Sequence, residues 1–312
     1  MAHVDFQTLI LPEAISDALP ESARKWGKFW ANPISRALHE AQPWVRFLPA
    51  IGRSIVEELS SLAPLSHAFL ESSLADLRES AEKYRIDRCV ILSDPNHVPN
   101  ARLLELADTD PMFIPAIRVP RAAKDSEEDV EREIADAHAH GARILQVHPA
   151  SDGIDPDHVF YANQLVAAAK RGWIVLVQTG APKAHLVYRK PEFSEIGRFE
   201  RWFRDHPKTK FVLSRMGFNE PERAMDLAER YANVCLETSW QPTETIAEAV
   251  RRVGPERVLF GSDWPILGNN QRVGTHRIRD AVASQMLTPE EAERILGGNA
   301  VELLAAAGRP LP

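Results

Sequence analysis

The stretch Arg257-Val258-Leu259-Phe260-Gly261-Ser262-Asp263-Trp264-Pro265 contains an apolar run that ends in an aspartate at a Gly-Ser turn. Branched and aromatic residues followed by a glycine predict a short buried strand over residues 257–260. In α/β proteins with parallel strands, the chemistry lies at the carboxyl ends of the strands. Asp263, directly after this strand, is therefore the first candidate for an active-site residue.

Short apolar runs recur along the chain and alternate with stretches in which apolar residues have helical spacing, such as Val130, Ile134 and Ala137. Strand followed by helix, repeated, predicts parallel pairing through right-handed crossovers. An open doubly wound sheet is the alternative, but no Gly-x-Gly-x-x-Gly follows the first strand. The pattern therefore favours an α/β fold, a single-domain (β/α)8 TIM barrel. The candidate strands cover residues 3–10, 88–92, 112–119, 142–148, 173–178, 210–215, 233–238 and 257–260.

Two segments lie outside this repeat. Residues 12–64 are too long for a simple connection and predict a helical insertion after the first strand, in which Trp26 and Trp30 share one helix face. The insertion either covers the mouth of the barrel or forms a subunit contact, which would make a homodimer plausible. Residues 288–312 predict C-terminal helices: Thr288 is an N-cap, Gly297 and Gly298 end the first helix, and a second helix follows.

Composition and charge narrow the range of partners and locations. A formal net charge of −7 gives no reason to expect nucleic acid. No apolar run approaches the roughly 20 residues that span a bilayer, and the first residues lack the features of a signal peptide. We therefore expect a cytoplasmic protein without membrane contact. Cys89 and Cys235 lie in strand-like runs and are expected to be buried thiols.

Several motifs carry a resemblance to a known family. They are Val4 to Pro12, Gln178-Thr179-Gly180, Phe211 to Gly217, Gly261 to Pro265, and Ile295 to Ala300. In this order they resemble the amidohydrolase-related family of the amidohydrolase superfamily, from Val4 to Leu304. The family includes hydrolases of cyclic and linear substrates and non-oxidative decarboxylases of the aminocarboxymuconate-semialdehyde type. The resemblance implies the barrel fold and an active site at the ends of its strands.

The resemblance also implies a metal site whose ligands this chain mostly lacks. Where typical members have two histidines on the first strand, the chain has Gln7 and Leu9. The histidines expected after the fifth and sixth strands are replaced by Gln178 and Arg215, and only Asp263 is retained. Zinc requires about four N, S or O donors, and a guanidinium is a permanent cation without a lone pair. We therefore expect no metal cofactor, zinc included, and no other cofactor.

Without a metal, the remaining side chains must do the chemistry. Asp263 is the expected general base, and Arg215 is expected to bind a substrate carboxylate or stabilise an oxyanion. His148, at the end of the fourth strand, is a candidate acid or base; the alternative is a histidine that caps the next helix. An inert Asp263–Arg215 ion pair is the alternative for the whole site. The other expected substrate contacts are Gln7, Gln178, His185, Tyr188 and Trp240.

These residues predict a metal-independent hydrolase that acts on a small carboxylate-bearing ester, lactone or amide. An activated carbonyl of this kind lessens the need for a Lewis acid. Two alternatives remain open: a decarboxylase or other lyase of a small carboxylic acid, and a barrel that binds a ligand without catalysis.

Overall fold

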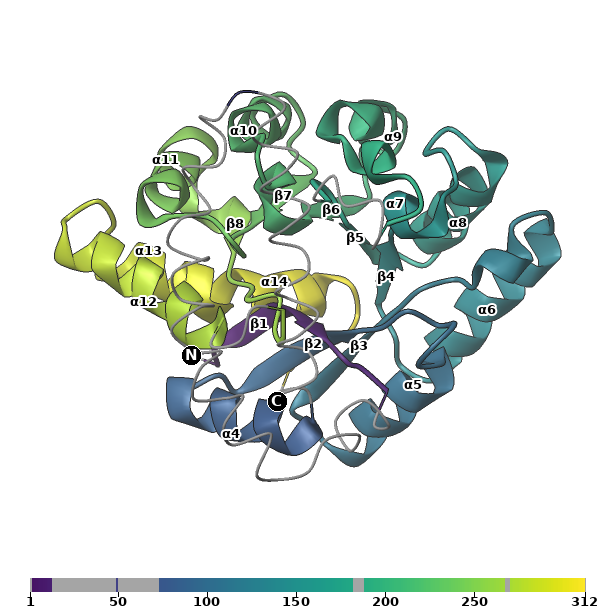
Figure 1. Ribbon diagram of the computed structural model, residues 1–312, viewed down its shortest axis with the longest axis horizontal. Coiled ribbons are helices and arrows are strands. Elements are labelled where there is room, and N and C mark those ends of the chain that lie inside the picture. The colour runs from purple at the N-terminus through teal and green to yellow at the C-terminus, as the bar shows by residue number, and fades with distance from the viewer. Residues whose placement is uncertain (1, 13–48, 50–72, 182–187, 267–269, 312) are drawn as a thin grey trace.

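A computed structural model describes residues 2–12, 49, 73–181, 188–266 and 270–311. All the predicted strands are present, and they form one eight-stranded parallel sheet in chain order. The sheet curls into a ring (Figure 1), and β1 meets the region of β8 through Phe6 N–H to Phe260 O at 2.9 Å and Leu9 N–H to Trp264 O at 2.6 Å. The predicted TIM barrel is thus confirmed. Its strands are β1 Val4–Leu9, β2 Arg88–Leu92, β3 Phe113–Ile117, β4 Ile144–Val147, β5 Ile174–Val177, β6 Lys210–Leu213, β7 Val234–Glu237 and β8 Val258–Leu259.

Helices surround this ring (Figure 1). Helix α6 illustrates why they form: Ser126 caps it by accepting the N–H of Asp129, its first turn is acidic, and Val130, Ile134 and Ala137 face the core. The helices are α4 Leu74–Tyr84, α5 Asn100–Thr109, α6 Glu127–Ala139, α7 Pro149–Asp152, α8 Val159–Lys170, α9 Glu200–Asp205, α10 Pro221–Arg230, α11 Thr243–Val253, α12 Asn270–Ala283, α13 Pro289–Glu293 and α14 Asn299–Ala306.

The core has two layers because side chains alternate between the faces of each strand. In β3, Ile114 and Ala116 belong to the cluster inside the barrel. Phe113 and Ile117 belong to the cluster between strands and helices. Ala300 and Leu304 of α14 also pack in the inner cluster, so this helix closes one end of the barrel. The polar site must therefore lie at the other end.

The C-terminal helices follow the prediction in one respect and depart from it in another. Thr288 is the N-cap, as expected, and it forms a capping box with Glu291. The prediction that Gly297 and Gly298 end the helix is wrong: a π-helical segment, η6 Arg294–Gly298, leads directly into α14, and Gly298 has helical angles of −52° and −47°. The carbonyl oxygen of Ala2 occupies the place that a Cβ of Gly297 would need. Glycine is required there for close packing and not for a turn.

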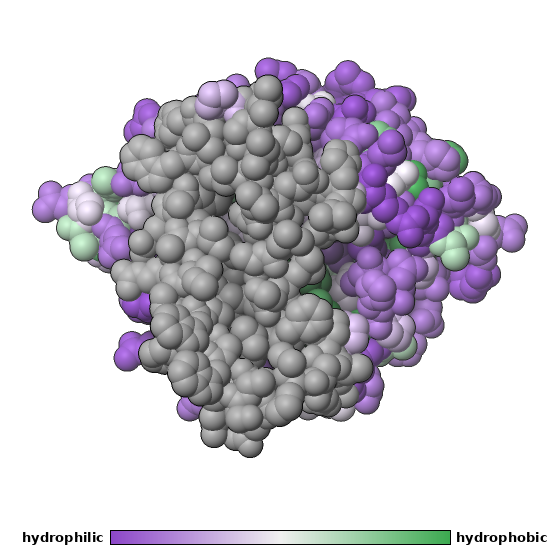
Figure 2. All heavy atoms as spheres, in the orientation of Figure 1, coloured by the Kyte–Doolittle hydropathy of each residue, from purple (hydrophilic) through white to green (hydrophobic). Residues whose placement is uncertain are grey.

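Apart from Pro12 and Pro49, the predicted insertion 12–64 lies outside the described residues, and its role stays a prediction. Cys89 and Cys235 are free and buried, as predicted. Within the described ranges, no helix is both long and apolar enough to traverse a bilayer. The described side chains visible in Figure 2 are mainly hydrophilic.

Candidate active site

Asp263 and Arg215 form a buried ion pair at the carboxyl ends of β8 and β6. The guanidinium donates from Nε to Oδ2 at 2.9 Å and from Nη2 to Oδ1 at 3.0 Å, and the two residues are 3% and 7% exposed. Burial lowers the pKa of Arg215, but the charge and hydrogen bonds of Asp263, together with Tyr188 and Glu237, outweigh it and the pKa is raised. Arg215 therefore stays cationic. Its third nitrogen, Nη1, is buried and has no hydrogen-bond partner among the described residues.

Two further donors complete the shell of the Asp263 carboxylate. Trp240, which follows β7, donates from Nε1 to Oδ2 at 2.8 Å, and Gln7 of β1 donates from Nε2 to Oδ1 at 2.7 Å. Gln178, after β5, donates to the Gln7 carbonyl at 3.5 Å and accepts from Ser214 Oγ at 3.2 Å. Each oxygen of Asp263 thus accepts two hydrogen bonds, which fills the roughly four lone-pair positions of a carboxylate.

The backbone around this site is unusual in ways that aim these side chains. The β1–β2 register shifts between Asp5 and Thr8, so one extra residue on β1 forms a bulge, a feature common beside active sites. Arg215, Trp240 and Asp263 all have positive φ, at 57°, 68° and 60°. Such angles cost about 1–3 kcal/mol each in non-glycine residues and concentrate at functional sites. The surrounding contacts hold these residues in place, for example Asp263 N–H to Gln7 O at 2.8 Å.

Two fully buried carboxyl groups bind the backbone next to the Asp263–Arg215 pair. Glu237, the last residue of β7, accepts the backbone N–H of Arg215 at 2.9 Å and the hydroxyl of Ser239 at 2.7 Å. Asp5 accepts the backbone N–H of Ser262 at 2.8 Å and its hydroxyl at 2.6 Å, next to Asp263. Burial raises the pKa of Asp5 to about 6 and that of Glu237 to about 7, although their hydrogen bonds lower it. Each fixes the backbone beside one member of the pair.

His148 lies at the end of β4 and is 8% exposed. It caps α7, with Nδ1 accepting the N–H of Ser151 at 3.3 Å, so the capping role considered from the sequence is present. Burial, then the charges of Arg118 and Arg215, hold its pKa well below the ordinary value. The imidazole is therefore neutral, and its proton resides on Nε2. Its ring centroid lies 5.4 Å from that of Tyr188.

Tyr188 is the partly buried neighbour of this imidazole. Burial raises the pKa of its hydroxyl, Arg215 lowers it and Asp263 raises it, so the phenol senses both members of the ion pair. Tyr188, His148 and the pair therefore belong to one electrostatic environment.

The structure thus joins Asp263, Arg215, Gln7, Gln178 and Trp240 through hydrogen bonds, and links His148 and Tyr188 to them electrostatically. Leu9 packs against the inner core cluster. His185 lies outside the described residues.

Sequence reasoning missed Asp5 and Glu237 as supports of the site. Both are acidic residues inside otherwise apolar strand runs, and that signal could have marked them.

The donor set does not fit a divalent metal ion. Arg215 stands where a ligand would be needed, and the amide nitrogen of Gln7 donates to the carboxylate of Asp263. All four acceptor positions of that carboxylate are occupied. Within the described part of the chain, no three or more His, Cys, Asp or Glu side chains are grouped so that they could hold a metal. Metal binding here would require breaking the buried ion pair.

Comparisons with solved structures agree with this fold. An uncharacterized TIM-barrel protein from Bordetella bronchiseptica aligns with a TM-score of 0.68 at 19% identity, over 99% of this chain and 100% of that one. 5-Carboxyvanillate decarboxylase from Sphingomonas paucimobilis aligns with a TM-score of 0.64 at 14% identity, over 97% and 99%. A zinc-bound amidohydrolase from Burkholderia multivorans aligns with a TM-score of 0.60 at 15% identity, over 99% and 100%.

The search of curated proteins finds no match. A family model described as amidohydrolase matches residues 56–305, which is most of the chain. The resemblance seen in the sequence motifs is thereby confirmed, and the chain belongs to the amidohydrolase family.

Proposed function

We propose that this barrel is a metal-independent enzyme that binds a small organic carboxylate at Arg215 and decarboxylates it without oxidation. The observation that carries the proposal is Arg215 Nη1, a buried cationic donor without a hydrogen-bond partner among the described residues. A buried unpaired donor costs free energy, and charge-assisted hydrogen bonds to an anionic oxygen recover it. Asp263 holds the other two nitrogens, so Nη1 is fixed in place before a ligand arrives.

The state of Asp263 favours decarboxylation over hydrolysis. Hydrolysis requires a base that takes a proton from water. Both Asp263 oxygens already accept two hydrogen bonds, so this carboxylate positions Arg215 and does not act as the general base expected from the sequence. Decarboxylation requires no activated water, because the carbon–carbon bond to the carboxylate breaks and carbon dioxide leaves.

The electron pair left on carbon must be stabilised and then protonated. Arg215 Nη1 carries two N–H groups: one holds the carboxylate, and the other donates to an adjacent carbonyl or phenol oxygen, which delocalises that pair. Tyr188 is the proton donor in this proposal, since its raised pKa keeps the hydroxyl protonated at neutral pH and its ring lies 5.4 Å from that of His148; the tyrosinate then regains a proton from water. His148 donates from Nε2 to the bound substrate. The family membership and the decarboxylase of similar fold support decarboxylation as the reaction.

The test combines a substrate screen with one variant. We expect carbon dioxide release from a panel of hydroxybenzoic and 3-oxo acids, and Arg215→Lys should lower kcat/KM by at least about 100-fold, because lysine cannot make the bidentate pair and present a third nitrogen as well. Carbon dioxide release that survives Arg215→Lys would refute the assigned role. Tight carboxylate binding without turnover would instead identify a binding protein.

Hydrolysis of an activated ester or lactone is the second candidate, favoured by the amidohydrolase family model. In that reaction Arg215 Nη1 would stabilise the oxyanion. Esters and lactones in the same screen separate the two reactions, because hydrolysis incorporates oxygen from labelled water into the product acid and releases no carbon dioxide.

A further inference from the structure

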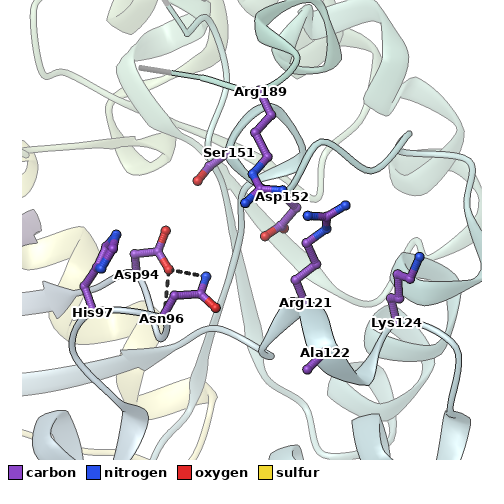
Figure 3. A pocket seen from close by; sticks show the side chains of 9 residues that line it. All are labelled: Asp94, Asn96, His97, Arg121, Ala122, Lys124, Ser151, Asp152 and Arg189. Atoms are coloured by element: carbon purple, nitrogen blue, oxygen red, sulfur yellow. Dashed lines mark hydrogen bonds between the residues drawn. The ribbon is translucent and has the colours of Figure 1, made fainter. Parts of the chain in front are cut away.

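A polar cavity lies at the mouth of the barrel, beside the ion-pair site described above. It has a volume of about 530 Å³, within the usual range for small-molecule pockets. Its lining comes from the loops that follow four consecutive strands, β2 to β5, and includes Asp94, Arg121, Lys124, Asp152 and Arg189 (Figure 3). The proposed reaction has not used any of these residues.

The cavity concentrates positive charge in a chain of net charge −7. Its two carboxylates are already paired with Arg118 behind them: Asp152 accepts from Nη2 at 2.5 Å, and Asp94 lies 3.5 Å from Nη1. Asp152 also accepts the hydroxyl of Tyr161 at 2.6 Å. Arg121, Lys124 and Arg189 therefore remain as cations that these carboxylates do not neutralise.

The three cations have few partners of their own. Among the described residues, Lys124 has only a loose ion pair, 3.7 Å from the exposed Asp125. Neither Arg121 nor Arg189 has an ion pair with any described residue, and Nε of Arg121 is buried without a hydrogen-bond partner. The two guanidinium groups approach Asp152 from opposite sides of the cavity (Figure 3). Two planar guanidinium groups that face the same cavity can donate paired hydrogen bonds to the oxygens of a carboxylate or a phosphate.

Short connections join this cavity to the Arg215 site. Ser151 lines the cavity, and its backbone N–H bonds to His148. Arg189 follows Tyr188, whose ring contacts His148, and the stem of Arg189 packs over Gly153, where a Cβ would lie 3.0 Å from it. One wall, made by α7 and the segment at 188–189, is therefore shared by both sites.

We propose that the cavity binds a second oxyanion group of the substrate, so that the substrate is a small organic dianion with its reacting end at Arg215. The inference rests on the proposed function for the position of the reacting end. The second group is a carboxylate or a phosphate, because both offer the oxygens that Arg121 and Arg189 can bind.

Binding of simple anions tests this directly in the full-length protein. We expect glutarate to bind at least about tenfold more tightly than butyrate by calorimetry, since one charge-assisted contact pair is worth roughly a factor of ten or more. Arg121→Gln and Arg189→Gln should each abolish that preference while leaving butyrate binding unchanged. Inorganic phosphate, tested alone, should bind the native protein and lose affinity about tenfold in both variants. If both variants lose phosphate affinity but the native protein binds glutarate and butyrate equally, the cavity binds anions but the proposal of one substrate that spans both sites is overturned.

The control is Lys208→Gln, an exposed lysine just before β6 and thus at the opposite end of the barrel, which should change none of these affinities. Phosphate binding that is unchanged in both arginine variants, or a glutarate preference that survives in both, would overturn the second subsite. Arg215→Lys separates this result from the proposed function, because it should abolish butyrate binding and leave phosphate binding intact. Butyrate binding that persists in Arg215→Lys, with phosphate binding lost in Arg121→Gln, would overturn the proposed position of the reacting end but not the anion cavity.

Discussion

Arg215 and Asp263 make two parallel hydrogen bonds, at 2.9 and 3.0 Å, across the mouth of the barrel at positions where the family would place a metal ligand and its carboxylate. Bidentate geometry holds the guanidinium plane in one orientation. The carboxylate is thereby committed to the arginine, and the chemistry of the site depends on the nitrogen that is left over.

The first prediction concerns stability. Asp263→Asn should destabilise the fold by about 3 kcal/mol, because it leaves the buried Arg215 charge without its partner. Urea unfolding at neutral pH measures this change. Asp205→Asn, which removes an exposed carboxylate paired with Arg204, is the matched control and should unfold like the native protein. Equal midpoints for the two variants would show that the buried pair contributes nothing.

The second prediction concerns metal. Since Arg215 repels a cation and Asp263 has no free lone pair, dialysis against a chelator should change neither the unfolding temperature nor any turnover found in the screen. Elemental analysis of freshly purified protein should find zinc and manganese well below one equivalent. One equivalent of either metal, lost on chelation together with activity, would refute the metal-independent proposal.

The third prediction concerns pH. Burial raises the pKa of Asp5 from 3.8 to about 6, so between these values the unfolded chain has released a proton that the folded chain retains. The free energy of unfolding should therefore fall as pH rises through this window. The contribution of Asp5 to it is about 3 kcal/mol; it is complete below pH 3.8 and is lost as pH rises to about 6. Glu237 acts in the same direction up to about pH 7.

Asp5→Asn tests this dependence. Its amide nitrogen can replace Oδ2 if it donates to Ser262 Oγ and if the amide of Gln271, which donates to Oδ2 at 3.0 Å, turns to present its oxygen. The variant should then fold and lose less stability than the native protein between pH 4 and 7. The exposed Asp125→Asn is the control and should retain the native dependence. Identical losses in native and Asp5→Asn proteins would mean that Asp5 titrates with its ordinary pKa.

The fourth prediction concerns His148. Burial and the charges of Arg118 and Arg215 hold its pKa well below the ordinary value, so the ring should be neutral at pH 6.5 and above, with the proton on Nε2. Nitrogen NMR of labelled histidine reports both the charge and the tautomer. A titration midpoint near 6.5 would restore His148 as the acid or base expected from the sequence.

The fifth prediction compares two glycines with similar backbone angles. Gly172 and Gly180 have φ of 65° and 63°, but a Cβ meets nothing at Gly172 and the backbone of Gly217 at Gly180. Gly172→Ala should cost about 1–2 kcal/mol of stability, the strain of the left-handed conformation alone. Gly180→Ala should cost clearly more and disturb the neighbouring Gln178 and Arg215. Equal costs in urea unfolding would show that the Gly180 contact is unimportant.

The strand pattern and the substituted residues were readable in the sequence because both are local properties. Short apolar runs alternating with helical stretches predict the barrel, and Arg215 in the place of a ligand histidine offered an ion pair with Asp263 as one of the alternatives for the site. The observed strand boundaries differ from the predicted ones by a few residues, because the end of a strand depends on its pairing with neighbouring strands. The termination at Gly297 was predicted wrongly, because a glycine required by close packing against Ala2 has the same one-residue signal as a glycine in a turn.

Relationships across the barrel were decided only by the tertiary structure. Gln7 and Asp263 are 256 positions apart in the chain and meet because the ring closes between β1 and β8. The saturation of Asp263 also depends on the bulge in β1 and on the angles at Arg215 and Trp240, which no local pattern encodes. The cationic cavity likewise draws on four separate loops. The sequence by itself determined which side chains are available at the barrel mouth, and closure of the barrel decided which of them are paired and which remain free to bind.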